Sequence, residues 1–422
     1  MKVAVIGAGA SGLCAAYRLQ KDHEVHLFEK RDRLGGNIST LNGNIASSAM
    51  REPVKIEAGV LGFHQASYPS VHRLFDELGV AQTTKTPTSA LFMGDVFLPS
   101  DPQKLLATSA LPRLITQPGQ MRHLMQMRRH YRDTFRNVVR REGLADEQIH
   151  DLLRDNESPA LKSFIHSLAS LAFSTSEEGA GALPASMVGP YLNATRYPEW
   201  TALKGGVWSY VEKLLEKSKF RISTGIQNIR VSRSANSVTV RAHGEALAFD
   251  EVVIAATPGQ VLSILDDPNN EERHVFSAWS DHSFRTRAHT SDKVYGRMRR
   301  LPRTPMDLFV DGVGRGFGYN TYMNEFYDIS GRTPYSFSYN LDDRIPEEAI
   351  LHTENHTVPT YNVDSTSTVD RIWEMNGRNS TWFCGAYLGD GLHEGAIASA
   401  EKVASSLQCG ERDRVSASLI AE

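Results

Sequence analysis

Three glycines near the N-terminus have the spacing of a phosphate-binding loop. Gly7, Gly9 and Gly12 form a GxGxxG pattern directly after a short apolar run. The first glycine permits a tight turn, the second lets the backbone approach a pyrophosphate, and the third lets a helix pack closely on a strand. Ala10 and Ser11 would begin that helix and direct its free N–H groups at the phosphates. The pattern therefore predicts a dinucleotide-binding turn between a strand and a helix.

A carboxylate stands at the second position that such a site requires. Glu29 ends the next strand-like run and follows Gly7 by 22 residues. A carboxylate there accepts hydrogen bonds from ribose hydroxyls and repels a 2′-phosphate. A glycine-rich turn alone is a weak signal. Its combination with Glu29 favours dinucleotide binding over a turn that holds no ligand.

The residues after Glu29 indicate which dinucleotide is bound. They resemble the ExxxRxGGR element of flavin-containing amine oxidases and phytoene-desaturase-like enzymes, with matches at Glu29, Arg33, Gly35 and Gly36. In such proteins the paired glycines bring a second loop against the pyrophosphate and ribityl chain of FAD, and the arginine lies beside the phosphates. Asn37 stands where the family usually has a second arginine, so one cationic contact is missing. The resemblance implies that FAD is the cofactor.

Other segments are similar to the same family. Residues 56–60 resemble the acidic-x-Gly segment that runs past the flavin ring, and residues 68–79 resemble a bacterial branch described as predicted NAD/FAD-binding proteins. Residues 383–396 resemble the C-terminal block whose Glu-Gly-Ala turn opens a helix towards the flavin. The resemblance implies further FAD contacts at Lys30, Gly59, Val60, Leu61, Ile229, Ala256, Gly385, Ala386, Glu394, Gly395 and Ala396.

Three side chains are candidates for catalysis. Glu57 lies in the segment expected beside the flavin, where burial would raise its pKa into the range of a general base. The alternative is a carboxylate that holds backbone amides or Arg51. His393 would contact the flavin edge or the substrate, or it would merely start the last helix. Arg287 would lie near the place where related amine oxidases have a lysine that holds a water, or else on a salt-bridged strand face.

Metal and disulfide chemistry have little support in the sequence. His352 and His356 have a metal-like spacing, yet the residues after them suggest a strand or loop, so we expect no metal site. The chain has three cysteines, which are scattered along it. Such usage fits a reducing compartment.

Composition narrows the class of protein. The 422 residues carry a formal net charge of -3, which gives no reason to expect a nucleic-acid partner. We find neither an apolar run of ~18 residues nor a leader before Lys2, so we expect no membrane span and a cytoplasmic location. Arginines concentrate within residues 122–141. They predict a solvated helix face or, alternatively, a docking site for an acidic carrier domain or an anionic lipid surface.

The expected fold is α/β. A Rossmann-like FAD-binding domain would be assembled from residues 1–81, 195–268 and 375–412. Residues 82–194 and 269–374 would form an inserted α+β substrate domain, helix-rich over residues 100–180, and residues 413–422 a frayed tail. This two-domain arrangement is the one implied by the resemblance to amine oxidases, and it places a cleft between the domains.

The predicted activity is FAD-dependent oxidation of a C–N bond in an amine or amide-like small molecule. Hydride would pass to flavin N5, and molecular oxygen would take the electrons. One alternative is a C–C desaturase or isomerase for a lipid or polyketide-like molecule, since the same fold hosts both chemistries. Another is a non-catalytic FAD-binding scaffold.

Overall fold

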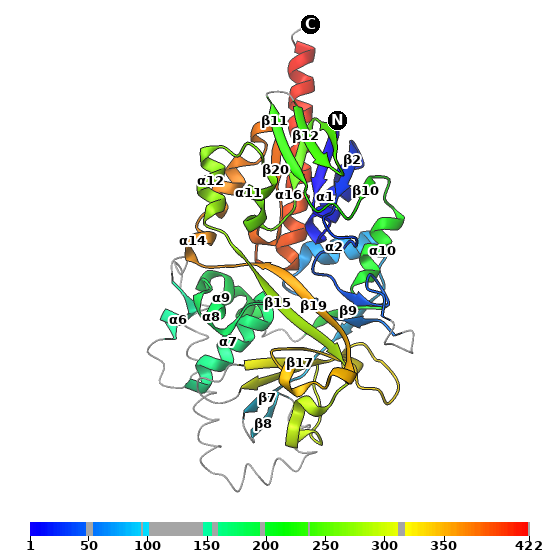
Figure 1. Ribbon diagram of the computed structural model, residues 1–422, viewed down its shortest axis with the longest axis vertical. Helices are drawn as coiled ribbons and strands as arrows, with labels where there is room; N and C mark the ends of the chain where they lie inside the picture. Colours follow the sequence, from blue (N-terminus) through cyan, green and yellow to red (C-terminus); the bar gives the residue numbers. More distant parts are fainter. Residues whose placement is uncertain are drawn as a thin grey trace.

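The computed structural model describes residues 1–47, 54–93, 96–100, 147–153, 159–194, 199–234, 237–310 and 317–420. Figure 1 shows a parallel sheet near the N-terminus and a second, larger sheet at the opposite end. The long strands β15 (Asp281–His289) and β19 (Ile350–Pro359) run from the first region into the second sheet. The molecule thus has two sheets whose adjoining ends can enclose a site.

The N-terminal sheet is parallel throughout. Its strands are buried apolar runs because both faces of a parallel sheet are covered. In spatial order it contains β10 (Arg221–Ser223), β2 (Glu24–Phe28), β1 (Lys2–Ile6), β14 (Glu251–Ile254) and β20 (Thr381–Phe383).

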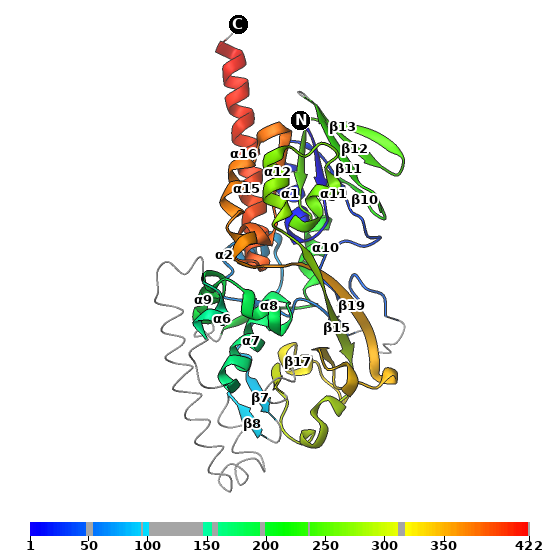
Figure 2. The same ribbon diagram turned by 60° about the vertical axis from the view of Figure 1, so that its left-hand side comes forward.

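Alternate residues of β1 enter two separate cores. Val3 and Val5 pack with helices α1 (Ala10–Leu19) and α16 (His393–Ile420), whereas Ala4 and Ile6 pack on the other face. An antiparallel meander covers much of that second face, opposite α16 in Figure 2. The meander contains β11 (Arg230–Ser234), β12 (Ser237–Ala242) and β13 (Glu245–Phe249).

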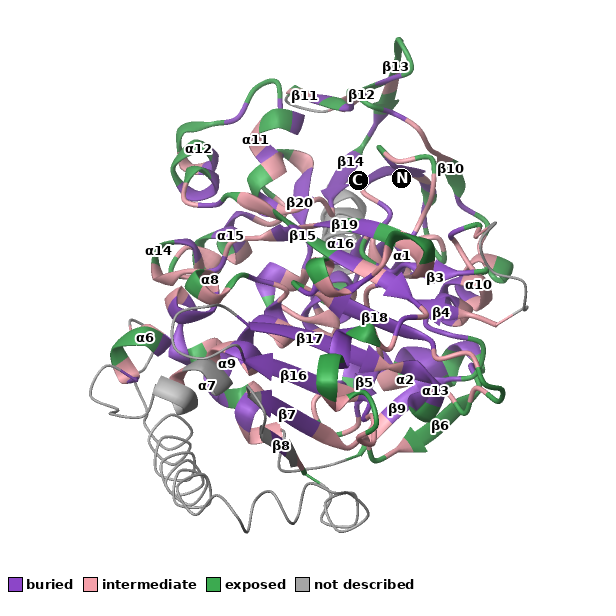
Figure 3. Ribbon diagram, turned by 60° about the horizontal axis from the view of Figure 1, so that its bottom comes forward, coloured by how far each residue is buried: buried purple, intermediate pink, exposed green. Residues whose placement is uncertain are grey.

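The second sheet has seven strands and is mixed. Figure 3 shows its central strands as largely buried. All neighbouring pairs are antiparallel except β16 and β7, which run parallel. Its order is β19, β15, β18 (Ser336–Tyr339), β17 (Phe317–Tyr322), β16 (Met306–Val310), β7 (Ser89–Met93) and β8 (Val96–Pro99).

Shorter elements connect and cover the two sheets. The small strands are β3 (Thr40–Leu41), β4 (Ile56–Glu57), β5 (Phe63–His64), β6 (Gln82–Lys85) and β9 (Trp200–Leu203). The remaining helices are α2 (Pro69–Leu78), α6 (Ile149–Leu152), α7 (Pro159–Phe173), α8 (Glu177–Ala182), α9 (Ala185–Ala194), α10 (Trp208–Glu216), α11 (Val261–Ile264), α12 (Asn270–Ser277), α13 (Met323–Phe326), α14 (Val363–Thr366) and α15 (Val369–Met375).

The expected fold class is confirmed: a parallel α/β sheet carries an inserted mixed α+β part. The domain boundaries themselves stay a prediction. The arginine-rich residues 122–141 lie outside the described residues, so the docking surface expected there also stays a prediction. Within the described part of the chain, no helix is both long enough and apolar enough to cross a bilayer.

Candidate FAD and substrate site

A cavity of about 790 Å³ lies between the two sheets. It begins at the turn after β1, passes the segment around Gly59, and ends among side chains of the seven-stranded sheet and helices α7 and α9. One continuous space therefore joins the expected phosphate site to the part of the chain expected to hold the substrate.

The glycine turn has the geometry of a phosphate cradle. Gly7 has a positive φ of 103°, and a Cβ there would lie 2.9 Å from the Ala255 carbonyl oxygen. A Cβ on Gly12 would lie 1.8 Å from the Gly7 carbonyl oxygen, so only glycine lets α1 pack here. Gly9 faces Gly36 of the second loop, whose Cβ would lie 2.9 Å from the Gly9 Cα. Both loops thus expose bare backbone to the cavity beside the N-terminus of α1, where an anion is stabilised.

Glu29 is held in position by two backbone donors. Its Oε2 accepts a hydrogen bond of 2.6 Å from the Ala8 N–H, and its Oε1 accepts one of 2.8 Å from the Arg31 N–H. The side chain is buried yet lines the cavity. A carboxylate oxygen accepts more than one hydrogen bond, so Glu29 keeps acceptor capacity for ribose hydroxyls. These residues fit a dinucleotide.

A sequence model of the flavin-containing amine oxidoreductases matches residues 10–355. The chain belongs to this family. The match covers most of the chain, including three of the five strands of the parallel sheet, many of the residues that line the cavity, and most of the seven-stranded sheet. It shows an FAD-dependent oxidoreductase of the amine oxidase type and confirms FAD as the cofactor.

Individual relatives carry different chemistries. Protoporphyrinogen oxidase 2 of Arabidopsis thaliana is 33% identical over 117 residues, which is 26% of this chain and 21% of that protein. A 4,4'-diapophytoene desaturase of Staphylococcus aureus (strain Newman) is 52% identical over 42 residues, 10% of this chain and 8% of the relative. The matched segments are therefore a minor part of either relative.

Solved structures with similar folds cover nearly the whole chain. A putrescine oxidase bound to putrescine aligns with a TM-score of 0.67 and 13% identity, over 97% of this chain and 99% of that one. At this identity the likeness shows the fold alone. The fold is shared, and the substrate must be argued from the cavity.

Most of the predicted cofactor residues lie together around the cavity. They would hold FAD along its length, the glycines at the phosphates and Glu29 at a ribose. Those that line the cavity are Gly7, Gly9, Ala10, Ser11, Glu29, Lys30, Gly35, Gly36, Asn37, Gly59, Val60, Leu61, Ile229, Ala256, Gly385, Ala386 and Ala396.

Four predicted cofactor residues have other positions. Gly12 packs behind the loop, and Gly395 lies against Asp390, which accepts a hydrogen bond from its N–H. The Glu394 carboxylate accepts hydrogen bonds from the Ser70 and Val71 N–H groups at the start of α2. The Arg33 guanidinium pairs with Glu354 of β19 at 2.9 Å. These four residues support the site from behind and do not line it.

The interpretation of Glu57 as a base needs correction. Glu57 has no exposed surface and does not line the cavity. Its carboxylate accepts hydrogen bonds of 2.8 Å from the Val207 N–H and from the Thr40 hydroxyl. Burial raises its pKa to about 8. Because β4 turns this side chain towards the start of α10, Glu57 holds a backbone amide, as its alternative interpretation expected, and does not face the cavity.

The proposed position of Arg287 also needs correction. Arg287 pairs with Asp342, and neither residue lines the cavity. Side chains alternate along a strand, so the neighbours Phe284 and Thr286 face the cavity instead. The face of β15 that carries Phe284 and Thr286 therefore lines the cavity, and the face that carries Arg287 does not.

His393 lines the cavity, as expected for a flavin or substrate contact. Its Nε2 lies 2.8 Å from the Tyr210 hydroxyl, and its ring packs edge-on to Phe63 with centroids 5.1 Å apart. Burial lowers its pKa to about 4, so the ring is neutral near pH 7. It also starts α16, and its contact with the flavin or substrate stays a prediction.

Several cavity residues were not predicted from the sequence. They are aromatic side chains from separate elements, together with Thr286 and His356, which the sequence offered only as a weak metal candidate. Within the described part of the chain no group of three or more metal-binding side chains lies together.

Aromatic side chains form much of the cavity wall. They include Phe173, Tyr191, Trp200, Phe284, Tyr319 and Phe337.

Proposed function

We propose that this protein oxidises a C–N bond of a small amine, with hydride passing to the flavin and molecular oxygen taking the electrons. The observation that carries the proposal is the aromatic wall of the cavity. Phe173 and Tyr191 pack with ring centroids 6.1 Å apart, and Tyr319 and Phe337 with centroids 6.0 Å apart. All four rings line the space that is continuous with the FAD cradle.

Aromatic faces suit an amine for two reasons. They attract a cationic nitrogen as it arrives, and they bind the apolar body of the molecule without fixing it by charge. The flavin supplies the two-electron chemistry once bound. The protein needs to orient the reacting C–H bond, exclude water and manage one proton, and a mostly apolar cavity with a few polar groups serves these tasks.

Anaerobic flavin reduction tests the proposal. The FAD-loaded protein is mixed with benzylamine or hexylamine without oxygen, and the absorbance of oxidised flavin is followed. We expect the absorbance to bleach with amine concentration and to return with formation of hydrogen peroxide when air is admitted. A panel of amines that leaves the flavin oxidised would contradict the proposal.

A second candidate is C–C desaturation or isomerisation of a lipid-like molecule. The apolar side chains of Leu171, Met306 and Phe337 at the same cavity favour it. Linoleate in the same anaerobic assay separates the two functions. Bleaching or double-bond migration with linoleate, and none with amines, would replace the amine proposal by this one.

A further inference from the structure

His356 has an unusual place for a titratable side chain. It lies on β19 opposite Phe284 of β15, is only 4% exposed, and lines the cavity together with Thr286 and Gly59. A Cβ on Gly59 would come within 2.9 Å of the His356 Cε1. Glycine thus lets the imidazole stand directly against a backbone segment that itself borders the cavity.

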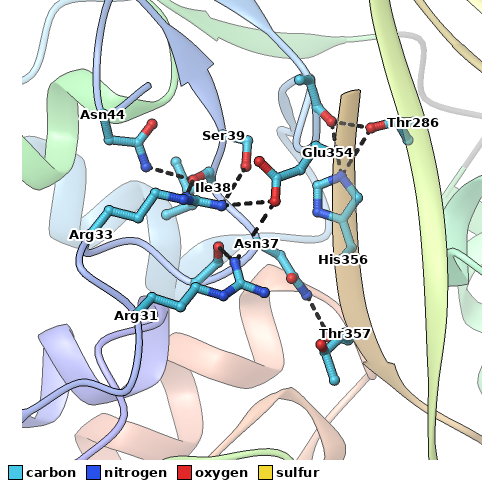
Figure 4. Close-up of polar contacts among 12 residues, drawn as sticks. Arg31, Arg33, Asn37, Ile38, Ser39, Asn44, Thr286, Glu354, His356 and Thr357 are labelled. Atoms are coloured by element: carbon cyan, nitrogen blue, oxygen red, sulfur yellow. Dashed lines mark hydrogen bonds and ion pairs between the residues drawn. The ribbon is translucent and has the colours of Figure 1, made fainter. Parts of the chain in front are cut away.

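Hydrogen bonds define which ring nitrogen carries the hydrogen. The His356 Nε2 lies 2.9 Å from the Ala58 carbonyl oxygen and 3.0 Å from the Thr286 Oγ1, which itself donates to the same carbonyl at 2.5 Å. A carbonyl oxygen only accepts, so Nε2 is the protonated nitrogen of the neutral ring. Nδ1 is then left with the free lone pair. Figure 4 shows the second ring nitrogen turned away from Thr286.

The charges around His356 are largely paired with one another. Glu354 on the same strand lies 2.9 Å from Arg33 and 3.1 Å from His352, and Arg31 lies 3.9 Å from the same carboxylate. Burial alone would raise the pKa of Glu354, but the His352 hydrogen bond and the Arg33 charge lower it to about 2. Burial lowers the pKa of His356, and the charges of Arg31 and Arg33 lower it further. The Ala58 carbonyl and Glu354 act in the opposite direction but do not cancel this effect. The resting imidazole is therefore neutral.

We propose that His356 is the proton acceptor of this cavity. An N–H bond of the substrate ammonium breaks, and the proton forms the Nδ1–H bond of His356. Bound FAD would supply the two-electron acceptor: the hydride of the amine C–H bond would pass to it, and the amine would become an iminium ion. The protonated His356 would offset the negative charge that bound FAD gains with the two electrons. The identity of the substrate rests on the proposed function. The assignment of His356 as the proton acceptor requires only that the protein binds FAD.

The first test needs no substrate. His356→Gln keeps an N–H donor near the ε position for Ala58 and lacks a basic nitrogen, while the matched control Thr286→Val keeps the imidazole. Flavin midpoint potentials are measured against pH on all three FAD-loaded proteins. Each proton taken up with two electrons changes the slope by about 30 mV per pH unit. We expect the midpoint potential to fall more steeply with pH in wild type and Thr286→Val than in His356→Gln. The difference should be about 30 mV per pH unit over part of the pH range. Equal slopes in wild type and His356→Gln would overturn the proposal.

The second test follows the substrate proton. Anaerobic flavin reduction by benzylamine should slow by roughly 10²- to 10⁴-fold in His356→Gln. FAD content and visible spectrum should be unchanged. If His356→Gln does not take up FAD, His356→Asn replaces it in both measurements. If no amine reduces the wild-type flavin, the proposed function fails, and the potential slopes still decide the role of His356. An amine that reduces both proteins equally fast overturns the assignment of His356 alone.

Discussion

At the scale of single residues, burial decides what a carboxylate can do. Glu57 sits behind the cavity with both oxygens hydrogen-bonded, and burial raises its pKa to about 8. The pKa of Glu57 is higher in the folded protein than in the unfolded chain. Between these two pKa values the folded state therefore holds a proton that the unfolded chain has released. The associated stability is fully present below the ordinary carboxyl pKa and is lost as the pH rises towards 8.

We predict that Glu57→Gln removes this pH dependence and leaves catalysis intact. Relative to the variant, the wild type should lose roughly 2 kcal/mol or more of unfolding free energy between about pH 5 and pH 8, since one pKa unit is worth about 1.4 kcal/mol. Urea unfolding at both pH values measures it. Flavin reduction by the active amine should remain within about threefold of wild type, and a loss of 10²-fold or more would restore Glu57 as a base.

At the scale of the strand–turn–helix element, Gly9 and Gly12 of the GxGxxG motif have different roles. A Cβ on Gly9 would meet nothing closer than the Gly36 Cα at 4.0 Å, so a side chain there has room in the protein and occupies the cradle. A Cβ on Gly12 would overlap the Gly7 carbonyl oxygen at 1.8 Å, which is backbone and cannot move aside alone.

We predict that Gly9→Val yields a folded protein without FAD. Gly12→Ala should instead destabilise the fold by roughly 3 kcal/mol or more, because α1 must shift away from the sheet. Thermal unfolding of the apoproteins and FAD content after reconstitution separate the two effects. A yellow Gly9→Val protein with normal FAD stoichiometry would show that this turn is not the pyrophosphate cradle.

At the scale of the whole molecule, a polar seam joins the two sheets. Arg33 follows the parallel sheet and pairs with Glu354 of the seven-stranded sheet, and the Asn37 amide donates to the Thr357 carbonyl at 3.0 Å (Figure 4). The pKa of Glu354 is lower in the folded protein than in the unfolded chain. Its contribution to stability is therefore present above the ordinary carboxyl pKa and is lost as the pH falls towards 2.

We predict that Arg33→Ala weakens this seam. The unfolding free energy at neutral pH should fall by roughly 1–3 kcal/mol, because a mostly buried carboxylate loses one of its partners. Acid unfolding should begin at higher pH than in wild type. The matched control is Arg285→Ala, which breaks an exposed pair with Asp342 and should cost about 0–1 kcal/mol. Equal costs for both variants in urea unfolding would show that the seam adds no stability of its own.

The sequence by itself determined the FAD cradle and the α/β class. Gly7, Gly9, Gly12 and Glu29 act through local geometry, namely turn conformation, close backbone approach and the end of a strand, and local geometry is readable from spacing. The short continuous apolar run before Gly7 is likewise typical of a strand in a parallel sheet that is covered on both faces. Resemblance at Gly35 and Gly36 then selected FAD, and the family match confirmed it.

Only the tertiary structure decided which side chains line the cavity. A strand presents alternate residues to opposite faces, and the packing of the second sheet determines which face meets the cavity. Thr286 therefore lines the cavity, and Arg287, which the sequence favoured, does not. Glu57 turned inward because the start of α10, 150 residues away, supplied its hydrogen-bond donor. His356 reached the site through a contact with Ala58, 298 residues earlier in the chain. Partners so distant leave no periodic signal in the sequence, because their meeting depends on how the two sheets pack.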